Sequence, residues 1–118
     1  MIDFEETPQQ KAVANRIREQ LNTKVNGFPL LALIGAKRES FGALPGDGGL
    51  SFAIGKPTSG LKANVVMVKY DAGNDLYNVE FWYIGYGKDV SITERESGLD
   101  VEQMISYVAR KLIAGCNL

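Results

Sequence analysis

A chain of 118 residues, 45% hydrophobic and 23% charged, is large and apolar enough to bury a core without disulfides or a metal. Its formal net charge of -1 argues against a dedicated binder of duplex nucleic acid, which usually carries a basic excess. The chain has no histidine and one cysteine, so it lacks the Ser–His and Cys–His pairs of many enzymes and the usual ligands of zinc. No catalytic residue, metal or cofactor is therefore expected.

A cytoplasmic location is expected from the ends and the apolar runs of the chain. The acidic N-terminal segment MIDFEETPQQ has neither the basic nor the apolar region of a signal peptide. The longest apolar run, FPLLALIGA, is too short to cross a bilayer, so no membrane partner is expected. A single cysteine fits the cytoplasm better than secretion, and the length predicts one domain over residues 1–118.

The first element is predicted to be a helix over about residues 8–22. Thr7 suits the N-cap, Pro8 the first helical position, and Gln10 the partner position of a capping box. An apolar stripe follows at helical spacing: Val13, Ala14, Ile17 and Leu21. Gly27 is expected to act as the stop after this helix.

A strand is predicted next, in FPLLALIGAKRES. Residues 30–34 are apolar without alternation, which predicts that both faces are covered, either in a central strand or against another chain. Leu31 and Leu33 are therefore candidate interface residues. LSFAIG is predicted to be a short strand. The Gly-rich segment 42–49 before it lacks the GK[ST] ending of a phosphate loop, so it is interpreted as a mobile connection or, if it closes over a ligand, as a lid.

A β-hairpin is the clearest pattern in the chain. Two alternating apolar runs flank DAGND, where Gly73 and Asn74 suit positive φ. The resulting register pairs Val65 with Trp82, Val66 with Phe81, Met67 with Glu80, Val68 with Val79, and Lys69 with Asn78. It also places Lys69 near Glu80, where a cross-strand ion pair is expected.

A second hairpin is predicted across GYGK, with Tyr83 opposite Val90 and Phe81 opposite Ile92. The two hairpins then share one apolar and one polar face. The core face is predicted to hold Val66, Val68, Val79, Phe81, Tyr83, Val90 and Ile92. The opposite face is predicted to hold Val65, Met67, Lys69, Asn78, Glu80, Trp82, Ser91, Thr93 and Arg95.

The last element is predicted to be a helix. Asp100 and Gln103 form a capping box, and Gly115 is the stop. An apolar stripe lies between them: Val101, Met104, Ile105, Val108 and Leu112. The order α-β-β-β-β-β-α predicts an α+β fold, an antiparallel sheet of about five strands with the N-terminal and C-terminal helices packed on one face.

Trp82 is the main candidate contact residue, because Val65 and Met67 complete an apolar island around it on a polar face. Three interpretations stay open: a protein interface, a ligand site, or an indole that covers side-chain stems or lies beneath a loop. Four basic residues are candidates for binding an anionic ligand together with Trp82: Lys37, Arg38, Arg95 and Arg110. Arg110 lies near a helix C-terminus, where the helix dipole alone would explain a cation.

The size and order of elements resemble, in architecture alone, small virus-encoded counter-defence proteins that sequester cyclic nucleotide signals as oligomers. This resemblance implies a non-catalytic homo-oligomer that captures a small anionic, nucleotide-like ligand at a protomer junction. Two alternatives remain. One is a protein-interaction module, an inhibitor or assembly adaptor, that uses the Trp82 face. The other is a small enzyme with carboxylate, Tyr or Lys chemistry, which requires two titratable groups that converge in a concave site.

Overall fold

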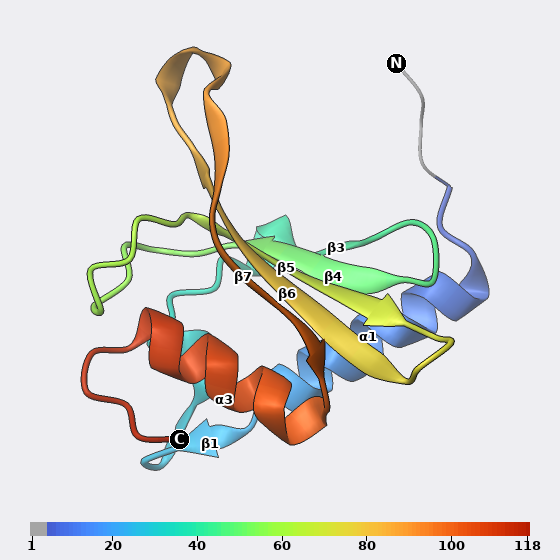
Figure 1. Cartoon of the computed structure of the whole chain (residues 1–118), viewed down its shortest axis with the longest axis horizontal. Helices are drawn as coiled ribbons and strands as arrows, with labels where there is room; N and C mark the ends of the chain where they lie inside the picture. The colour runs from blue at the N-terminus through green and yellow to red at the C-terminus, as the bar shows by residue number, and fades with distance from the viewer. Residues whose placement is uncertain (1–4) are drawn as a thin grey trace.

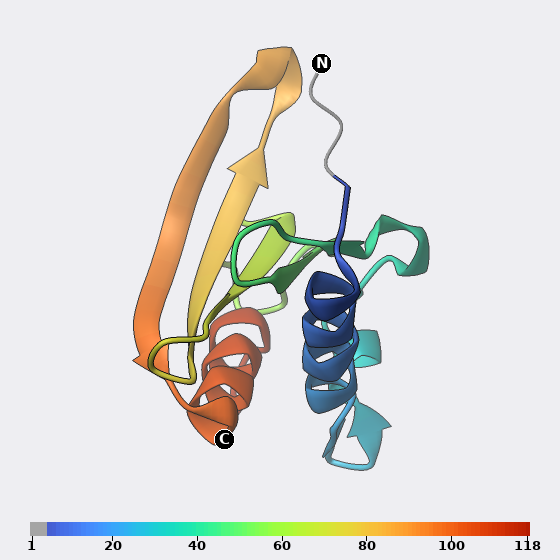
Figure 2. The ribbon, with the colours of Figure 1, turned by 90° about the vertical axis from the view of Figure 1, so that its right-hand side faces the viewer.

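The computed structural model describes residues 5–118, apart from the side chain of Lys88, and has the α+β fold predicted from the sequence. Two helices, α1 (Pro8–Leu21) and α3 (Val101–Leu112), lie side by side on one face of an antiparallel sheet (Figures 1 and 2). The sheet has the order β3-β4-β5-β6-β7. Its strands are β3 (Gly42–Ala43), β4 (Gly49–Ala53), β5 (Val65–Asp71), β6 (Leu76–Ile84) and β7 (Val90–Leu99). No helix within residues 5–118 is long and apolar enough to cross a membrane.

The core lies between the two helices and the inner face of the sheet. Both helices begin with the predicted capping boxes, which join Thr7 to Gln10 and Asp100 to Gln103. Each helix turns its apolar stripe toward the sheet, because burial of those side chains is the main stabilising term. The most completely buried side chains are Ile17, Leu21, Leu30, Phe52, Val66, Val68, Val79, Phe81, Met104, Val108 and Leu112.

The strand predicted at 30–34 is wrong: the segment forms the short helix α2 (Leu30–Leu33). Leu30 and Ile34 are buried four residues apart and Ala32 between them is exposed, whereas a strand would place all three on the same face. An apolar run this short does not distinguish the two structures by its pattern. The hairpin β1 (Lys24–Val25) and β2 (Phe28–Pro29) precedes α2. Its turn is Asn26–Gly27, with φ of 52° and 85°, so Gly27 closes a hairpin rather than stopping a helix.

The predicted register of the β5–β6 hairpin is confirmed at every pair, including Val66 with Phe81 and Val65 with Trp82. The turn differs in one detail, because Asp75 takes the positive φ of 52° that was expected at Gly73 or Asn74. Phe81 is fully buried beneath the helices, and Trp82 is half-buried on the opposite face of the sheet. The predicted sidedness of these two neighbours is therefore correct.

The predicted register of the β6–β7 hairpin is wrong by one residue. Ile84 pairs with Val90 and Trp82 pairs with Ile92, so Val90 and Ile92 lie on the face of Trp82 and not in the core. The cause is the loop, which has an odd number of residues centred on Gly87, whose φ is 75°. An irregularity after Ile92 restores the alternation, so that Arg95 lies opposite Glu80 on the outer face as predicted.

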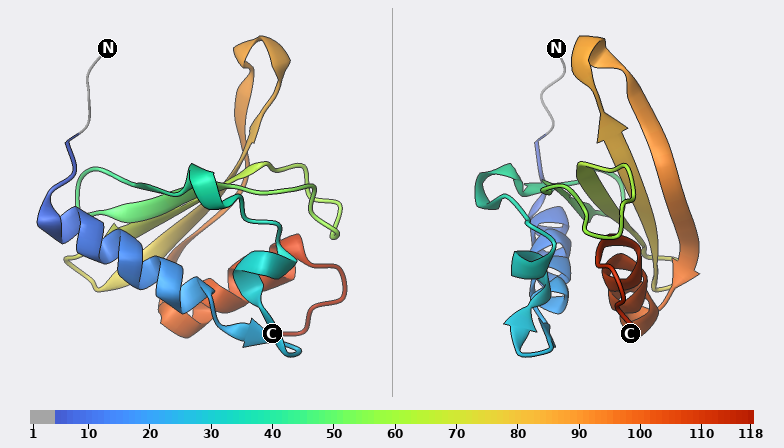
Figure 3. Two further views of the ribbon diagram at one scale, coloured as in Figure 1. Left: turned by 180° about the vertical axis from the view of Figure 1, so that it is seen from behind. Right: turned by 90° about the vertical axis from the view of Figure 1, so that its left-hand side faces the viewer.

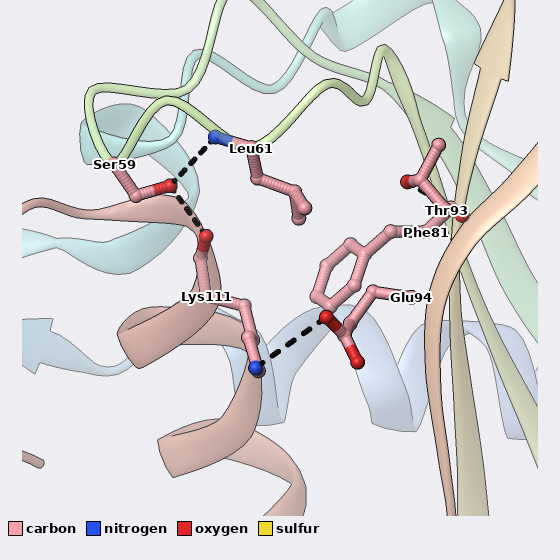
Figure 4. Close-up of polar contacts among 6 residues, drawn as sticks. All are labelled: Ser59, Leu61, Phe81, Thr93, Glu94 and Lys111. Carbon is pink, nitrogen blue, oxygen red and sulfur yellow. Dashed lines mark hydrogen bonds and ion pairs between the residues drawn. The ribbon is translucent and has the colours of Figure 1, made fainter.

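The loop between β4 and β5 caps the C-terminus of α3 (Figure 4). The Ser59 hydroxyl donates to the Lys111 carbonyl at 2.5 Å, and the Ser59 N–H donates to the Leu112 carbonyl at 3.3 Å. The last carbonyls of a helix have no partner within the helix, so these bonds satisfy groups that would otherwise be left open. The Lys111 side chain reaches Glu94 on β7 at 3.5 Å. The C-terminal end of α3 is thus joined both to the β4–β5 loop and to β7.

Candidate functional site

The outer face of the sheet carries a patch of apolar side chains from three adjacent strands. Trp82 lies in its centre, with Val65 of β5 as its paired residue on one side and Ile92 of β7 on the other. We call this the outer-face patch, and it consists of Val65, Met67, Trp82, Ile84, Val90 and Ile92. Within residues 5–118 both long helices lie on the other face of the sheet (Figures 2 and 3).

The indole of Trp82 is held in place by its neighbours on the outer face. Its N–H donates to Glu80 Oε1 at 2.9 Å, and the other oxygen of Glu80 accepts from Lys69 Nζ at 3.1 Å. The cross-strand ion pair expected between Lys69 and Glu80 is thus confirmed. A half-buried indole whose N–H is already bonded presents mainly its apolar ring, which is the part that contributes most at protein interfaces.

The patch continues onto an arm that projects from the body of the protein. The arm is the far end of the β6–β7 hairpin with its loop, and it rises well beyond the other strands (Figure 1). Its apolar side chains are exposed: 46% for Ile84, 51% for Val90 and 41% for Ile92. Tyr86, in the loop, is fully exposed. Neighbouring apolar side chains that are this open mark an interaction surface more often than isolated ones do.

A cavity of about 550 Å³ lies at the other end of the patch, between Trp82 and Met67 on one side and the Gly-rich loop on the other. Leu44, Pro45, Asp47 and Gly48 of this loop form its rim. The loop is a connection from β3 to β4, and it is bonded to two other elements. Gln10 of α1 donates to the Gly46 carbonyl at 3.0 Å, and the Tyr70 N–H donates to the Gly48 carbonyl at 2.9 Å. These two hydrogen bonds favour a loop that is fixed at the edge of the cavity over a loop that opens and closes as a lid.

The charges on the outer face are nearly balanced. Lys69 and Arg95 face three carboxylates, Glu80, Asp47 and Asp71. Asp47 accepts the Ala72 N–H at 3.0 Å, and Asp71 accepts the Asn74 side-chain amide and two backbone N–H groups, which lowers the pKa of its carboxyl. Asp47 and Asp71 therefore stabilise the turn after β5. A phosphate group would find no excess of cations here.

The predicted site residues fall into four places. Trp82, Val65, Met67 and Arg95 share the outer face. The other predicted residues lie elsewhere: Arg110 on α3, Lys37 and Arg38 in the segment before β3, and Leu31 and Leu33 on α2. The structure of one chain does not bring the four predicted basic residues together. Ile84, Val90 and Ile92 also belong to the patch, although the sequence does not predict it, because the odd number of residues in the loop around Gly87 shifts the register by one.

A second concave site lies between α1 and the segment that contains α2. This groove of about 590 Å³, which we call the helix groove, is lined by Arg18, Arg38, Glu19 and the side chain of Phe41, among others. The Arg18 guanidinium lies 4.0 Å from the centre of the Phe41 ring. Two arginines against one carboxylate make this groove the more cationic of the two sites. Of the predicted residues, Arg38 and Leu31 line it.

The fold and the site define a small α+β protein with an inner sheet face that two helices cover and a patch of apolar side chains on the outer face. Comparison of the chain with protein-family models, curated proteins and solved structures finds no match. Among the described residues, no group of three or more His, Cys, Asp or Glu side chains is placed to hold a metal ion.

Proposed function

We propose that this protein is a non-catalytic interaction module that binds another protein through the outer-face patch. The observation that carries the proposal is the alignment of Val65, Trp82 and Ile92 across three strands, continued by exposed side chains on the arm. An indole in the middle of an apolar surface with polar neighbours is the arrangement typical of an interface hot spot.

The chemistry of the patch defines the partner that it fits. The centre would receive an apolar side chain in the cavity beside Trp82, which Met67 and Leu44 also line. The rim would contribute hydrogen bonds and charge contacts through Lys69 and Arg95, both exposed. Because the charges nearly cancel, the partner surface is expected to be apolar with few charges, as at the centre of stable complexes.

Site-specific photo-crosslinking in cells that produce the protein tests this proposal. A benzoylphenylalanine at Ile84, in the patch, is compared with the same probe at Phe28, which is 62% exposed on β2. We expect a defined crosslinked product from position 84 that Trp82→Ala removes, and no such product from position 28. Equal products from both positions, or a product at position 84 that survives Trp82→Ala, would contradict a partner site centred on Trp82.

A small anionic ligand in the helix groove is a second candidate function, which the pairing of Arg18 and Arg38 beside Phe41 supports. An aromatic ring and guanidinium groups would stack on a base and neutralise phosphate. A nucleotide panel followed by native mass spectrometry and thermal shift tests it. Binding is expected to be lost in Arg18→Gln and Arg38→Gln and kept in Arg110→Gln, which lies on α3 outside the groove. Absence of binding across the panel would remove this candidate.

A further inference from the structure

Strand β7 forms one edge of the sheet and pairs with β6 along one side only. Among residues 5–118, no strand pairs with its other side. A free strand edge is a row of N–H and C=O groups that another strand can pair with, and proteins usually protect it with charges, bulges or short length. β7 is ten residues long, so length does not protect it.

Charged residues protect the second half of β7 from pairing with another strand, but they do not protect the first half. Glu94, Arg95 and Glu96 place three charges in a row, next to an irregularity in the pairing with β6. The segment 90–93, which we call the edge segment, has the sequence VSIT, with no charge and no proline. Its two aliphatic side chains, Val90 and Ile92, are exposed, and it lies on the projecting arm, where a second chain can approach (Figure 1).

The backbone of the edge segment points its bonding groups outward. On β6, the Trp82 carbonyl accepts the Asn64 N–H at 2.8 Å, and the Ile84 N–H donates to the Asn64 side chain at 2.9 Å, so these groups point away from β7. Antiparallel strands alternate between bonded and non-bonded pairs. The residues opposite them, Ile92 and Val90, are therefore in non-bonded pairs and present their own N–H and C=O groups to the free edge.

We propose that two copies of this chain associate by antiparallel pairing of their edge segments, with Ser91 of one copy opposite Ser91 of the other. Val90 of each copy then lies opposite Ile92 of the second copy. Both residues present outward groups, so each of the two pairs exchanges two backbone hydrogen bonds. A two-fold axis perpendicular to the sheet keeps the outer faces of both copies on the same side.

The sequence of β7 favours pairing of two copies in the register centred on Ser91 over pairing in other registers. A centre at Ser91 places aliphatic side chains opposite aliphatic side chains, which stabilises a strand pair. A centre at Arg95 would place Glu94 opposite Glu96, and a centre at Glu94 would place that carboxylate opposite its own copy. Like charges directly opposite one another are destabilising, so the charged half of β7 excludes the longer overlaps.

The joined sheet would double the outer-face patch without covering its centre. Trp82 lies on β6, one strand away from the paired edge, and its side chain stays accessible on the outer face in this arrangement. The dimer therefore does not depend on the proposed partner site. Its test uses the purified protein alone, so failure of the dimer and failure of partner binding are separate results.

Sedimentation equilibrium over a concentration series, together with one pair of variants, tests the proposal. Ile92→Pro removes the outward N–H without removing a bond to β6, whereas the control Ile92→Val keeps the N–H and the branched side chain. We expect the wild type and Ile92→Val to dimerise and Ile92→Pro to raise the dissociation constant by at least about tenfold, a loss of about 1.4 kcal/mol. A wild type that stays monomeric, or an Ile92→Pro variant that dimerises as the wild type does, would overturn the proposal.

Disulfide trapping tests the register. A non-bonded antiparallel pair has Cα atoms about 4.5 Å apart, within the range that a disulfide spans. In a Cys116→Ser background, Ser91→Cys should therefore form a covalent dimer on mild oxidation, and Ser97→Cys, in the protected half of the strand, should not. Equal trapping at both positions, or trapping at position 97 alone, would rule out the register centred on Ser91.

Discussion

The carboxylate of Glu80 contacts the Trp82 indole and the Lys69 ammonium at the same time, at 2.9 Å and 3.1 Å. One side chain thus fixes the orientation of the ring in the middle of the outer-face patch. Because the chain has one tryptophan, its intrinsic fluorescence reports on this place alone.

Removal of the Glu80 carboxylate should release the indole. In Glu80→Ala, the N–H loses its acceptor and the ring gains freedom, so we expect a red-shifted emission and faster quenching by acrylamide. Glu80→Gln keeps an oxygen acceptor and should resemble the wild type, although it loses the ion pair with Lys69. The free energy of unfolding should fall by less than about 1 kcal/mol in both variants, because the ion pair lies at the surface. Identical quenching in Ala and Gln variants would show that Glu80 does not hold the ring.

Two adjacent aromatic residues should differ sharply in their contribution to stability. Phe81 is fully buried and packs on Tyr107, with ring centres 5.5 Å apart, so Phe81→Ala should cost about 3–5 kcal/mol. Trp82 is half-buried on the outer face, and Trp82→Ala should cost about 1 kcal/mol. Urea unfolding followed by circular dichroism measures both. Equal losses would contradict the assignment of the two faces.

Tyr107 should make the protein sensitive to alkali. Its side chain is buried, its hydroxyl finds no hydrogen-bond partner among the described residues, and burial raises its pKa to about 12. A raised pKa stabilises the fold fully below the unfolded value of 10 and loses that contribution as the pH rises toward 12. The free energy of unfolding should therefore fall by about 1.4 kcal/mol per pH unit in this window because of this group.

Tyr107→Phe is the matched variant for that prediction. It removes the ionisable hydroxyl and keeps the ring, so the loss between pH 10 and 12 should become smaller. At neutral pH the variant should be as stable as the wild type or more stable, since an unpartnered buried hydroxyl costs about 1–3 kcal/mol. Tyr70, whose pKa is raised by its hydrogen bond to Asp75, is present in both proteins and cancels from the comparison. Parallel pH profiles of the two proteins would contradict the role of Tyr107.

Gly49 should not tolerate a side chain, whereas Gly55 should. A Cβ at Gly49 would lie 2.9 Å from Leu44 Cδ1 and 3.1 Å from Lys69 Cα, and closer still to the Val68 carbonyl oxygen. Gly49→Ala should therefore lower the stability by about 1–3 kcal/mol through overpacking between β4 and β5. A Cβ at Gly55 would meet no heavy atom within 4 Å. Gly55→Ala should therefore change the stability by less than about 1 kcal/mol. Thermal unfolding compares the two, and equal shifts would contradict the close approach at Gly49.

The register of the β5–β6 hairpin could be predicted because two independent patterns in the sequence agree there. The alternation around Val66 and Val79 sets the faces, and the DAGND turn sets the length of the loop. The positive φ moved to Asp75, yet the number of loop residues stayed the same, so the register was unaffected. With the faces fixed, Trp82 and Met67 could be placed together on the outer face.

The register of the β6–β7 hairpin could not be predicted, because the burial preference of its side chains favours a different register from the one in the structure. Val90 and Ile92 are aliphatic, and a core position is the usual place for such residues. The loop centred on Gly87 instead places them on the surface, and no local pattern in the sequence outweighs their apolarity. The helix groove was missed for a different reason: Arg18 and Arg38 are far apart along the chain, and only the packing of α1 against the segment before β3 brings them together.

The two edge strands of the sheet differ in length, and this difference would limit how many copies the proposed strand pairing can join. β3 is two residues long and offers almost no backbone for pairing, whereas β7 is ten residues long. A symmetric contact through β7 uses the same edge strand of both copies and leaves only the two short β3 strands at the outer edges of the joined sheet. Growth into a fibre would need a second long strand at an edge, and β3 does not supply one, so the strand pairing that we propose would end at two copies.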